Sequence, residues 1–339
     1  LIKSITGCRD ALLTPSCTAA LELTSLLVDI NPGDEIIMPS YTFVSTANAY
    51  VLRGAVPVFV DVDSETMNID LDLIKNAISP KTKAVVAVNY AGSCCNIDQL
   101  ANICSEENLI LIEDAAQSMQ SFFGGRHLGT IGAMGTISFH ETKNICCGEG
   151  GVLLINDESY LERAEILREK GTNRSKFFRG QVDKYTWSDI GSSYLLSDLN
   201  AAYLLAQLEA SDFITQERLR QWNFYDDQFE ELENKGLLRR PRIQSECSHN
   251  AHIYYIMANS LHERQSFITW MKSHNVYCAF HYVPLHSSPM GARIGKLGSS
   301  MKNTISASEC LVRLPMGPGF DTGFVASKVL EFFDASEFR

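Results

Sequence analysis

The chain has 339 residues, of which 45% are hydrophobic and 20% are charged, and its 22 glycines and 10 prolines are scattered rather than clustered. This is the composition of an ordinary globular protein, and it excludes a disordered chain, collagen and a coiled coil. Acidic residues outnumber basic ones by 40 to 29, so the formal charge is −11, which argues against a nucleic-acid partner. Any anionic ligand must therefore be held by a few local groups.

The length predicts one large domain with a smaller partner, because hydrophobic cores stop growing near ~250–300 residues. The sequence has no run of 18 apolar residues, so we predict a cytoplasmic protein with no membrane partner. The first residues, Leu1-Ile2-Lys3-Ser4, form neither a signal peptide nor an initiator methionine. We expect that the chain lacks its natural beginning.

The ten cysteines include two adjacent pairs, Cys94-Cys95 and Cys146-Cys147, but no Cys-x-x-Cys spacing. Neither a zinc site nor a disulfide framework is expected in a protein of this size. We interpret most of the cysteines as reduced, small apolar side chains of the core.

Between residues 16 and 156, short β-branched apolar runs alternate with helical patterns. That rhythm predicts βαβ units and a mostly parallel sheet. A helix rich in alanine and leucine, which we expect to be buried, covers residues 19–30. The predicted strands are 35–38, 56–60, 84–88, 109–112, 135–139 and 152–155, and the predicted helices are 42–53, 71–78, 97–106 and 160–169.

A polar, aromatic segment at residues 172–180 interrupts the alternation and is predicted to be a functional loop. Helical patterns at 197–209 and 218–233 then lead to a second region of mixed α/β pattern. We predict a large, three-layer α/β/α domain over residues 1–210, followed by a linking helix and a small α/β domain over residues 211–339.

Two predicted turns offer groups suited to a flat, anionic ligand. At 16–19 a helix begins, and its free backbone N–H groups, hydroxyls and dipole could hold an anion, although an ordinary N-cap is the alternative. At 39–43 a strand passes into a helix through Tyr41 and Phe43, whose rings could stack on a flat ligand or belong to the core. Ligands of open parallel sheets bind at such strand ends.

Two further strand ends carry ionisable groups. The strand at 109–112 runs directly into Glu113 and Asp114, and a carboxylate there can pair with a protonated heterocyclic nitrogen or cap the next turn. Lys143 follows another strand and precedes the Gly-rich turn 148–151, so it could be either a desolvated, nucleophilic amine or a solvated surface lysine. Together these groups define a pocket for pyridoxal phosphate (PLP).

Six motifs resemble, in order along nearly the whole chain, those of the DegT/StrS-type sugar aminotransferases, which are PLP enzymes of fold type I. The motifs are Ser-Cys-Thr-Ala (16–19), Pro-Gly-Asp-Glu (32–35), Pro-Ser-Tyr-Thr-Phe (39–43), Glu-Asp-Ala-Ala-Gln (113–117), Ser-Phe-His-Glu-Thr-Lys-Asn (138–144) and Gly-Glu-Gly-Gly (148–151). The resemblance implies an aspartate aminotransferase-like fold, PLP that alternates with pyridoxamine phosphate (PMP), and a homodimer with active sites at the subunit interface.

The resemblance also assigns roles to residues. Lys143 would bond to the cofactor, and Asp114 would keep the ring nitrogen protonated through a charge-assisted hydrogen bond. The other implied cofactor-binding residues are Cys17, Thr18, Ala19 and Ser138 around the phosphate, Phe43 on the ring face, Gln117 near the ring hydroxyl and, weakly, Ser193 from the partner subunit.

The implied substrate-binding residues are Arg174, Arg179, Lys184 and Tyr185, with His281 and Tyr282 from the second region. The alternatives are a solvated basic loop and, for the histidine-rich segment 281–286, hydrogen-bonded histidines at a domain interface. No metal site is expected, because neither carboxylates nor cysteines cluster with these histidines in the sequence.

The chain departs from the family pattern in three places. Ser193-Tyr194-Leu195 stands where many relatives have Asn-Tyr-Arg, in which the Asn reaches the phosphate of the partner subunit, and Ser193 takes the place of that Asn. Cys17 and Cys147 stand where glycine is common. The Gly-rich arm with which relatives begin is expected to be missing.

Residues 168–187 most resemble those of a branch that uses L-glutamate to aminate C4 of dTDP-4-dehydro-6-deoxyglucose. The product, dTDP-4-amino-4,6-dideoxygalactose, serves surface polysaccharide (common antigen) synthesis, and the implied reaction is ping-pong, with Lys143 moving the proton. Another nucleotide keto-sugar, 3-keto or UDP-linked, is the alternative substrate.

Three other functions are alternatives to this one. A PLP-dependent sugar dehydratase has histidine in place of Lys143, and a non-catalytic sensor loses Lys143 or Asp114, whereas both are present here. A nicotinamide dehydrogenase needs a G-x-G-x-x-G turn after its first strand, and residues 129–135 lack that spacing.

Overall fold

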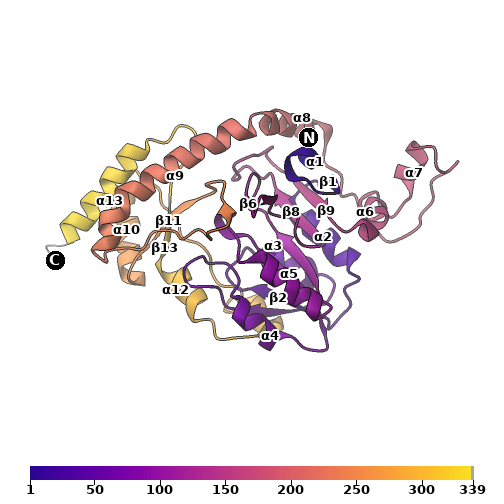
Figure 1. Ribbon diagram of the computed structural model, residues 1–339, viewed down its shortest axis with the longest axis horizontal. Coiled ribbons are helices and arrows are strands. Elements are labelled where there is room, and N and C mark those ends of the chain that lie inside the picture. Colours follow the sequence, from indigo (N-terminus) through magenta and orange to yellow (C-terminus); the bar gives the residue numbers. More distant parts are fainter. Residues whose placement is uncertain (337–339) are drawn as a thin grey trace.

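An eight-stranded sheet forms the centre of the larger part of the molecule (Figure 1). The structure is a computed structural model, and it describes residues 1–336. The strand order is β1-β9-β8-β5-β4-β2-β3-β12, and every pair is parallel except those that β9 makes with β8 and β1. The strands are β1 (Asp10–Thr14), β2 (Glu35–Pro39), β3 (Val56–Val60), β4 (Thr82–Val88), β5 (Ile110–Asp114), β8 (Met134–Ser138), β9 (Gly151–Ile155) and β12 (Lys296–Leu297).

The predicted α/β fold with a mostly parallel sheet is confirmed. Six of the eight strands lie within a few residues of their predicted positions. The sequence did not reveal β1, which precedes the first recognised motif, or β12, a two-residue exposed edge strand that the second part of the chain adds beside β3. An edge strand this short has no periodicity that a sequence pattern could show.

Helices cover both faces of the sheet because adjacent strand residues point to opposite sides. On one face Ile36 and Met38 pack with α2 (Cys17–Leu27), α3 (Val44–Val51) and α6 (Leu161–Arg168). On the other face Ile37 packs with the layer formed by η1 (Leu71–Leu73), α4 (Ile74–Ala77) and α5 (Ile97–Glu106). Helix α2 is buried along most of its length, as predicted.

Two predicted helices differ in detail. The pattern at 71–78 forms a 3₁₀ turn, η1, followed by the single turn of α4. The pattern at 42–53 becomes helical only at Val44, because Phe43 keeps an extended backbone at the N-cap. Short additional elements are α1 (Ile2–Thr6), η2 (Tyr90–Gly92), β6 (Phe122–Phe123), β7 (Arg126–His127), η3 (Glu158–Tyr160), β10 (Cys247–Ser248) and α11 (Pro289–Ile294).

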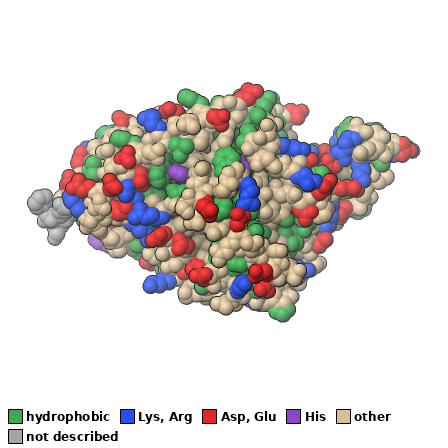
Figure 2. Space-filling view, viewed as in Figure 1, with side chains coloured by type: hydrophobic (Ala, Val, Ile, Leu, Met, Phe, Trp, Pro, Cys, Tyr) green, Lys and Arg blue, Asp and Glu red, His purple; other side chains and the backbone are tan. Residues whose placement is uncertain are grey.

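The segment after α6 leaves the body of the molecule as an arm, which we define as residues 172–187 (Figure 1). Residues 172–180 were predicted to be a loop, and they contain the five-residue helix α7 (Arg174–Phe178). Figure 2 shows basic and acidic side chains gathered on this projection. The exposed fractions of Phe178 and Trp187 are 68% and 82%, so the arm presents large apolar groups to its surroundings.

The long helix α9 (Ser211–Asn234) follows α8 (Asp198–Glu209) and leads to a smaller lobe (Figure 1). There α9 packs with β11 (Tyr254–Met257), β13 (Leu311–Leu314), α10 (Leu261–Ser273) and α13 (Thr322–Ser336), and the core of this lobe is formed by side chains between residues 222 and 333. Helix α12 (Lys302–Cys310) precedes β13. The predicted division at residue 210 falls between α8 and α9 and stays a prediction, because β12 returns to the large sheet.

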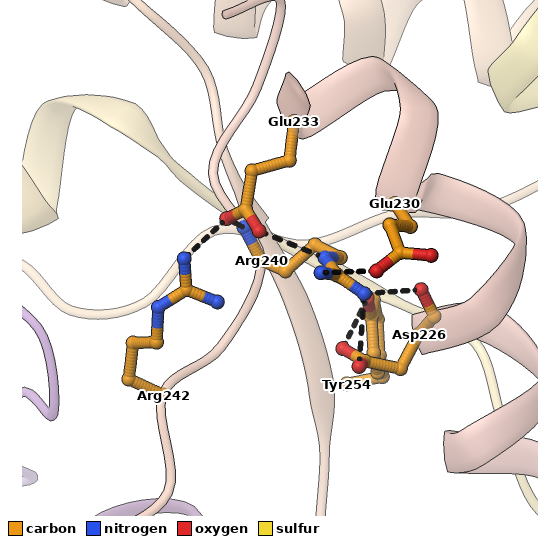
Figure 3. Close-up of polar contacts among 6 residues, drawn as sticks. All are labelled: Asp226, Glu230, Glu233, Arg240, Arg242 and Tyr254. Carbon is orange, nitrogen blue, oxygen red and sulfur yellow. Dashed lines mark hydrogen bonds and ion pairs between the residues drawn. The ribbon is translucent and has the colours of Figure 1, made fainter.

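An ion-pair network fastens α9 to the chain that follows it (Figure 3). The guanidinium of Arg240, only 13% exposed, lies 2.9 Å from the Glu233 carboxylate and 3.0 Å from that of Asp226. The Tyr254 hydroxyl of β11 donates to Asp226 at 3.2 Å. Because these charges are mutually satisfied, the network fixes the geometry of the small lobe without contributing to the cavity described below.

All ten cysteines are free, and seven of them are buried, which agrees with their predicted role as small core side chains. None of the helices within residues 1–336 is long and apolar enough to cross a bilayer. In the same part of the chain, three or more His, Cys, Asp or Glu side chains nowhere gather as a metal site would require.

Candidate active site

A cavity of about 820 Å³ lies at the carboxyl edge of the large sheet, where the smaller lobe faces it. Its floor and walls come from the start of α2, the turn into α3, the end of β5 and the segment 138–143. The smaller lobe adds His252, Ile253, His281, Tyr282 and Arg313. The topology thus brings together groups that lie more than 250 residues apart in the sequence.

Asp114 ends β5 and is 5% exposed. Its Oδ2 accepts a 2.7 Å hydrogen bond from the Thr46 hydroxyl, and its Oδ1 accepts from the backbone N–H of Ala116 at 3.2 Å. Burial raises the pKa of Asp114, because a charged carboxylate is poorly solvated there. A protonated ring nitrogen would supply the missing positive charge, so this carboxylate suits the predicted partner.

The neighbouring carboxylate, that of Glu113, has a structural role. Adjacent strand residues point to opposite sides, so Glu113 faces away from the cavity. It accepts backbone N–H groups of Gly129, Ile131 and Gly132 at 2.7–2.8 Å. Of the two acids that end this strand, only Asp114 is available for chemistry.

Lys143 extends into the cavity beside Asp114 and Cys17. Burial lowers the pKa of Lys143, and the positive charge of Arg313 lowers it further, while the carboxylate of Asp114 acts in the opposite direction. The shift favours the neutral, nucleophilic amine. Burial also raises the pKa of the Cys17 thiol to about 12, so this cysteine adds no negative charge to the pocket.

The predicted phosphate-binding turn lies at the start of α2. Ser16 caps the helix by accepting the N–H of Ala19 at 3.1 Å, and the Thr18 hydroxyl lies 2.8 Å from that of Ser45. Cys17 and Thr18 line the cavity, as Ser138 does, but Ala19 does not, because its N–H is turned to Ser16. The first N–H groups of a helix have no partner inside it, which makes this end suitable for a phosphate.

Gly151 brings the Gly-rich turn against this helix start. A Cβ at this position would lie 2.4 Å from the backbone nitrogen of Cys17, so any larger residue would displace the helix start. Here the glycine is required by close approach rather than by its backbone angles.

Gln117 connects the two lobes. Its Oε1 accepts the N–H of Ala91 at 2.7 Å, and its Nε2 donates to the Tyr282 hydroxyl at 3.0 Å. Tyr282 stacks on His281 with ring centroids 3.9 Å apart, and the Nδ1 of His281 lies 3.2 Å from the Tyr90 hydroxyl. His281 and Tyr282 therefore line the cavity and also connect the two lobes, and their role in binding substrate stays a prediction.

The electrostatic state of His281 follows from its surroundings. Burial lowers the pKa of His281 to about 2, and the charges of Arg313 and Lys143 add to this effect. The imidazole is therefore neutral and can offer a hydrogen bond without a charge. Phe43 also lines the cavity with 59% of its surface exposed, and stacking on a ligand ring stays a prediction.

The structure does not bring the arm to the cavity of its own chain, and Ser193, which follows it, is also exposed outside. The guanidinium of Arg179 forms two 2.7 Å bonds to Glu165, and that of Arg174 lies over the Phe178 ring and 4.0 Å from Glu169. Both arginines are paired with glutamates of their own chain, so neither is placed to bind a diphosphate within the same subunit. The predicted substrate residues outside the cavity are Arg174, Arg179, Lys184 and Tyr185.

Among the cavity residues that were not predicted from the sequence are Thr46, His252 and Arg313. Thr46 lies in the first turn of α3 and binds Asp114, a contact between helix and strand that no local motif reveals. Arg313 had a visible signal, because it is the only charged residue within the apolar run 311–314. A charge inside a buried strand commonly marks a site.

Comparison with known proteins agrees with this geometry. A model of the DegT/DnrJ/EryC1/StrS aminotransferase family matches residues 2–331. The spore coat polysaccharide biosynthesis protein SpsC of Bacillus subtilis is 31% identical over 92% of this chain and 82% of its own. The aminotransferase TlmJ from Streptoalloteichus hindustanus is 28% identical and superposes with a TM-score of 0.89 over 98% of this chain and 89% of its own.

The putative sugar aminotransferase Spr1654 from Streptococcus pneumoniae has the same fold, with a TM-score of 0.89 at 24% identity over 99% of this chain and 89% of its own. It has been solved in PLP and PMP forms. The predicted cofactor and the predicted enzyme class, a PLP-dependent sugar aminotransferase, are confirmed at the level of the family. The chain belongs to the DegT/DnrJ/EryC1/StrS aminotransferase family.

Proposed function

We propose that this enzyme transfers the amino group of L-glutamate to C4 of dTDP-4-dehydro-6-deoxy-D-glucose. The products are dTDP-4-amino-4,6-dideoxy-D-galactose and 2-oxoglutarate, so the enzyme is a dTDP-4-amino-4,6-dideoxygalactose transaminase. The observation that carries the aminotransferase chemistry is the pairing of Lys143 and Asp114 in one buried cavity. The exact sugar rests on the resemblance of residues 168–187. The name of SpsC supports a role in polysaccharide synthesis, for which we infer a cytoplasmic location.

The residues of the cavity fit PLP. Asp114 is a buried carboxylate without a cationic partner bonded to it, the start of α2 can receive a phosphate, and Lys143 can bond to the cofactor carbon. Phe43 and Gln117 would border the ring. When bound, the cofactor supplies an electron-accepting ring and the carbon that carries the amino group.

The protein itself contributes proton transfer by Lys143, whose position in the cavity is fixed by the fold. Lys143 Nζ would remove the proton from Cα of glutamate, and in the second half of the reaction it would give a proton to C4 of the sugar. Its lowered pKa favours the neutral amine that this base needs. Asp114 would hold the ring nitrogen of the cofactor protonated, while Thr46 and Ala116 fix the orientation of its carboxylate.

The keto-sugar needs groups that recognise hydroxyls and a diphosphate. His281 and Tyr282 are neutral donors and acceptors on the small-lobe side of the cavity, so we assign them to the sugar hydroxyls. Lys184 has no ion pair within residues 1–336 and is exposed, whereas Arg179 is paired with Glu165. Of the arm residues, Lys184 is therefore the best candidate for the diphosphate.

We further propose a homodimer in which the arm of one subunit reaches the cavity of the other. The arm lies outside its own cavity, and its exposed Phe178, Tyr185 and Trp187 provide an apolar surface that a second copy would cover. Ser193 follows the arm in the chain and would approach the partner's phosphate in the same arrangement.

The test of the proposed function is product analysis. The loaded enzyme receives [¹⁵N]glutamate with dTDP-4-keto-6-deoxyglucose, dTDP-3-keto-6-deoxyglucose or a UDP-linked 4-keto sugar, and NMR locates the label. We expect ¹⁵N at C4 of the dTDP-4-keto sugar with the galacto configuration. Label only at C3, or only in the UDP sugar, would overturn the substrate while keeping the class.

A further inference from the structure

Two cysteines from distant parts of the chain meet beside the large sheet. Cys94 follows the turn η2 and is fully buried, and Cys247 begins β10, 153 residues later in the sequence. Their sulfur atoms lie 3.3 Å apart, within hydrogen-bond distance. Residues 1–336 include all ten cysteines, and in this part of the chain no second pair of thiols is in contact.

The fold holds these two thiols in place from both sides. Strand β10 pairs antiparallel with β6, so that Cys247 lies opposite Phe123. Cys94 and Phe123 belong to the apolar layer between the sheet and α5, and Cys247 packs against the same layer. Because an S–S bond is about 2 Å long, the two sulfurs need to approach by only about 1.3 Å to form one.

The two thiols differ in acidity and in access. The hydrogen bond that Cys94 donates lowers the pKa of Cys247 to about 7, against the opposing effect of burial. The same hydrogen bond, together with burial, raises the pKa of Cys94. Cys247 is partly exposed, and its neighbours Glu246 and Ser248 are exposed. It is therefore the reachable thiolate, and Cys94 is the protonated partner behind it.

The other partly exposed thiols lack this arrangement. Cys146 and Cys278 share the intermediate exposure of Cys247, but within the described residues neither contacts a thiol from a distant segment. Burial raises the pKa of Cys278 to about 12, so this thiol stays protonated and unreactive at neutral pH. Among these three cysteines, Cys247 is the one that an oxidant should modify first.

The two segments that carry the pair also hold Gln117, which lines the cavity. The N–H of Ala91 donates to the side-chain oxygen of Gln117 at 2.7 Å, and Asn250 Nδ2 donates to its backbone carbonyl at 2.8 Å. Cys94 and Cys247 each lie about three residues from one of these contacts, and neither lines the cavity itself. A bond between the two sulfurs would fasten the supports of Gln117 without entering the site.

We propose that Cys94 and Cys247 form a reversible disulfide when a peroxide reaches the protein. The bond, which we call the clamp, joins the segment 247–252, which leads into the smaller lobe, to the part of the molecule built on the large sheet. This inference goes beyond the proposed function and holds whichever sugar the enzyme aminates.

The reaction with hydrogen peroxide balances in two steps. The Cys247 thiolate attacks one oxygen, so an S–O bond forms, the O–O bond breaks, and the released hydroxide takes up a proton to become water. The Cys94 sulfur then attacks the sulfur of this sulfenic acid, so the S–S bond forms and the S–O bond breaks. The proton of the Cys94 thiol leaves with the hydroxide as a second water. The two thiols lose two electrons in total, and a dithiol reductant reverses the change.

The expected consequence is greater stability of the same folded enzyme. A cross-link between residues that are 153 positions apart restricts the unfolded chain, and the small movement of the sulfurs leaves the folded state nearly unchanged. The clamp would therefore keep the supports of Gln117 assembled under oxidising conditions.

The test treats the PLP-loaded enzyme with a small excess of hydrogen peroxide and maps its thiols by mass spectrometry after alkylation and digestion without reductant. We expect peptides joined through Cys94 and Cys247, with the other cysteines still alkylated. The Tm should rise by about 3–7 °C, and the absorbance of the lysine-bound cofactor should persist to a correspondingly higher temperature. Dithiothreitol should restore the original Tm.

Three variants separate the roles of the thiols. Cys94→Ser leaves the oxidised Cys247 without its partner, so dimedone should trap a sulfenic acid there and the Tm should not rise. Cys247→Ser should give neither the sulfenic acid nor the disulfide. The control Cys278→Ser removes another partly exposed thiol and should form the clamp with the same rise in Tm as the wild-type enzyme.

Three results would overturn the inference. A disulfide through other cysteines that forms before the one between Cys94 and Cys247 would place the reactive thiol elsewhere. Oxidation of Cys247 in the wild-type enzyme without a link to Cys94 would show that the two sulfurs do not reach each other. A linked protein whose Tm is unchanged or lower, or which loses the cofactor absorbance at room temperature, would refute the stabilising clamp.

Discussion

The cavity and the arm are two regions of this molecule that differ in almost every physical respect. The cavity is built at the edge of a buried sheet, its ionisable groups are desolvated, and hydrogen bonds fix Asp114 and Tyr282. The arm of residues 172–187 is exposed, carries a helix of five residues and pairs its two arginines with Glu165 of α6 and with Glu169, which follows that helix. We infer a division of labour in which the cavity performs the chemistry and the arm contributes to substrate choice in another subunit.

The difference between the cavity and the arm shows which of the pKa shifts can affect catalysis. In the cavity, burial moves the pKa of Asp114 upward and that of Lys143 downward, as a site for proton transfer requires. On the arm, the pKa of Arg179 rises through its bond to Glu165, which only reinforces an ion pair at the surface. Changes in the cavity should therefore affect turnover, and changes in the arm should affect the affinity for the keto-sugar.

The largest effect is expected from Lys143→Ala. Without this amine the proton has no acceptor, so sugar amination should fall at least about 10⁴-fold. Product formation measured by mass spectrometry, together with loss of the visible absorbance of lysine-bound cofactor, checks the result. Lys176→Ala, an arm lysine paired with Glu162, is the matched control and should leave both readouts near the wild-type values.

Asp114→Asn should reduce turnover by about 10²- to 10³-fold, because the neutral amide cannot hold the ring nitrogen protonated. The same change should stabilise the cofactor-free protein at neutral pH. The raised pKa of Asp114 means that its contribution to stability is present at low pH and is lost as the pH rises through the folded-state pKa. Thermal melting should show a higher Tm for the variant at pH 7 and no difference below about pH 4; a lower Tm at pH 7 would refute this account.

The rate of the donor half-reaction should depend on pH through Lys143. Since burial lowers its pKa below the ordinary 10.5, the neutral amine becomes available as the pH rises through that lowered value. Arg313→Gln removes a nearby positive charge and should move the rise to higher pH. A single-turnover pH profile measures the shift, and an unchanged midpoint would show that Arg313 does not act on this amine.

A smaller effect is expected from Lys184→Gln on the arm. If this lysine meets the diphosphate of the keto-sugar, the KM for that substrate should rise about 10-fold while the half-reaction with glutamate stays unchanged. Steady-state kinetics at two salt concentrations check this, because the wild-type KM should rise with salt more steeply than that of the variant. An equal change in the glutamate step would contradict the division of labour.

The smallest effect on catalysis is expected from Arg240→Met, which breaks the network of the smaller lobe. Removing this guanidinium leaves Asp226 and Glu233 without their buried partner, so the free energy of unfolding should fall by about 2–3 kcal/mol. Urea denaturation measures the loss. The two half-reactions of the folded variant should stay within about 2-fold of wild type, and a selective loss in one of them would connect the network to the site.

Much of the lining of the cavity could be predicted from the sequence because each of its parts is local. Asp114 follows an apolar strand, Lys143 follows another, and Ser16 opens a helix, so strand ends alone indicated where the cavity lies. The same locality explains why six of eight sheet strands were found.

What could not be predicted depends on contacts between distant segments. Arg313 is about 170 residues from Lys143, and only the packing of β13 against the large domain brings them together. The intrachain pairing of Arg179 with Glu165 likewise follows from the fold of α7 beside α6. The sequence shows that this loop is basic, but it does not show which carboxylate or ligand pairs with each basic side chain.

Subunit mixing tests the division of labour most directly. A Lys143→Ala protein with an intact arm is mixed with a protein whose arm is disabled by Lys184→Gln and Tyr185→Ala, and subunits are exchanged under mild denaturant. If the arm acts in the partner's cavity, each mixed dimer contains one complete site, and keto-sugar amination at low substrate should recover to about a quarter of wild type. No recovery above the sum of the separate variants would show that the arm does not act across subunits.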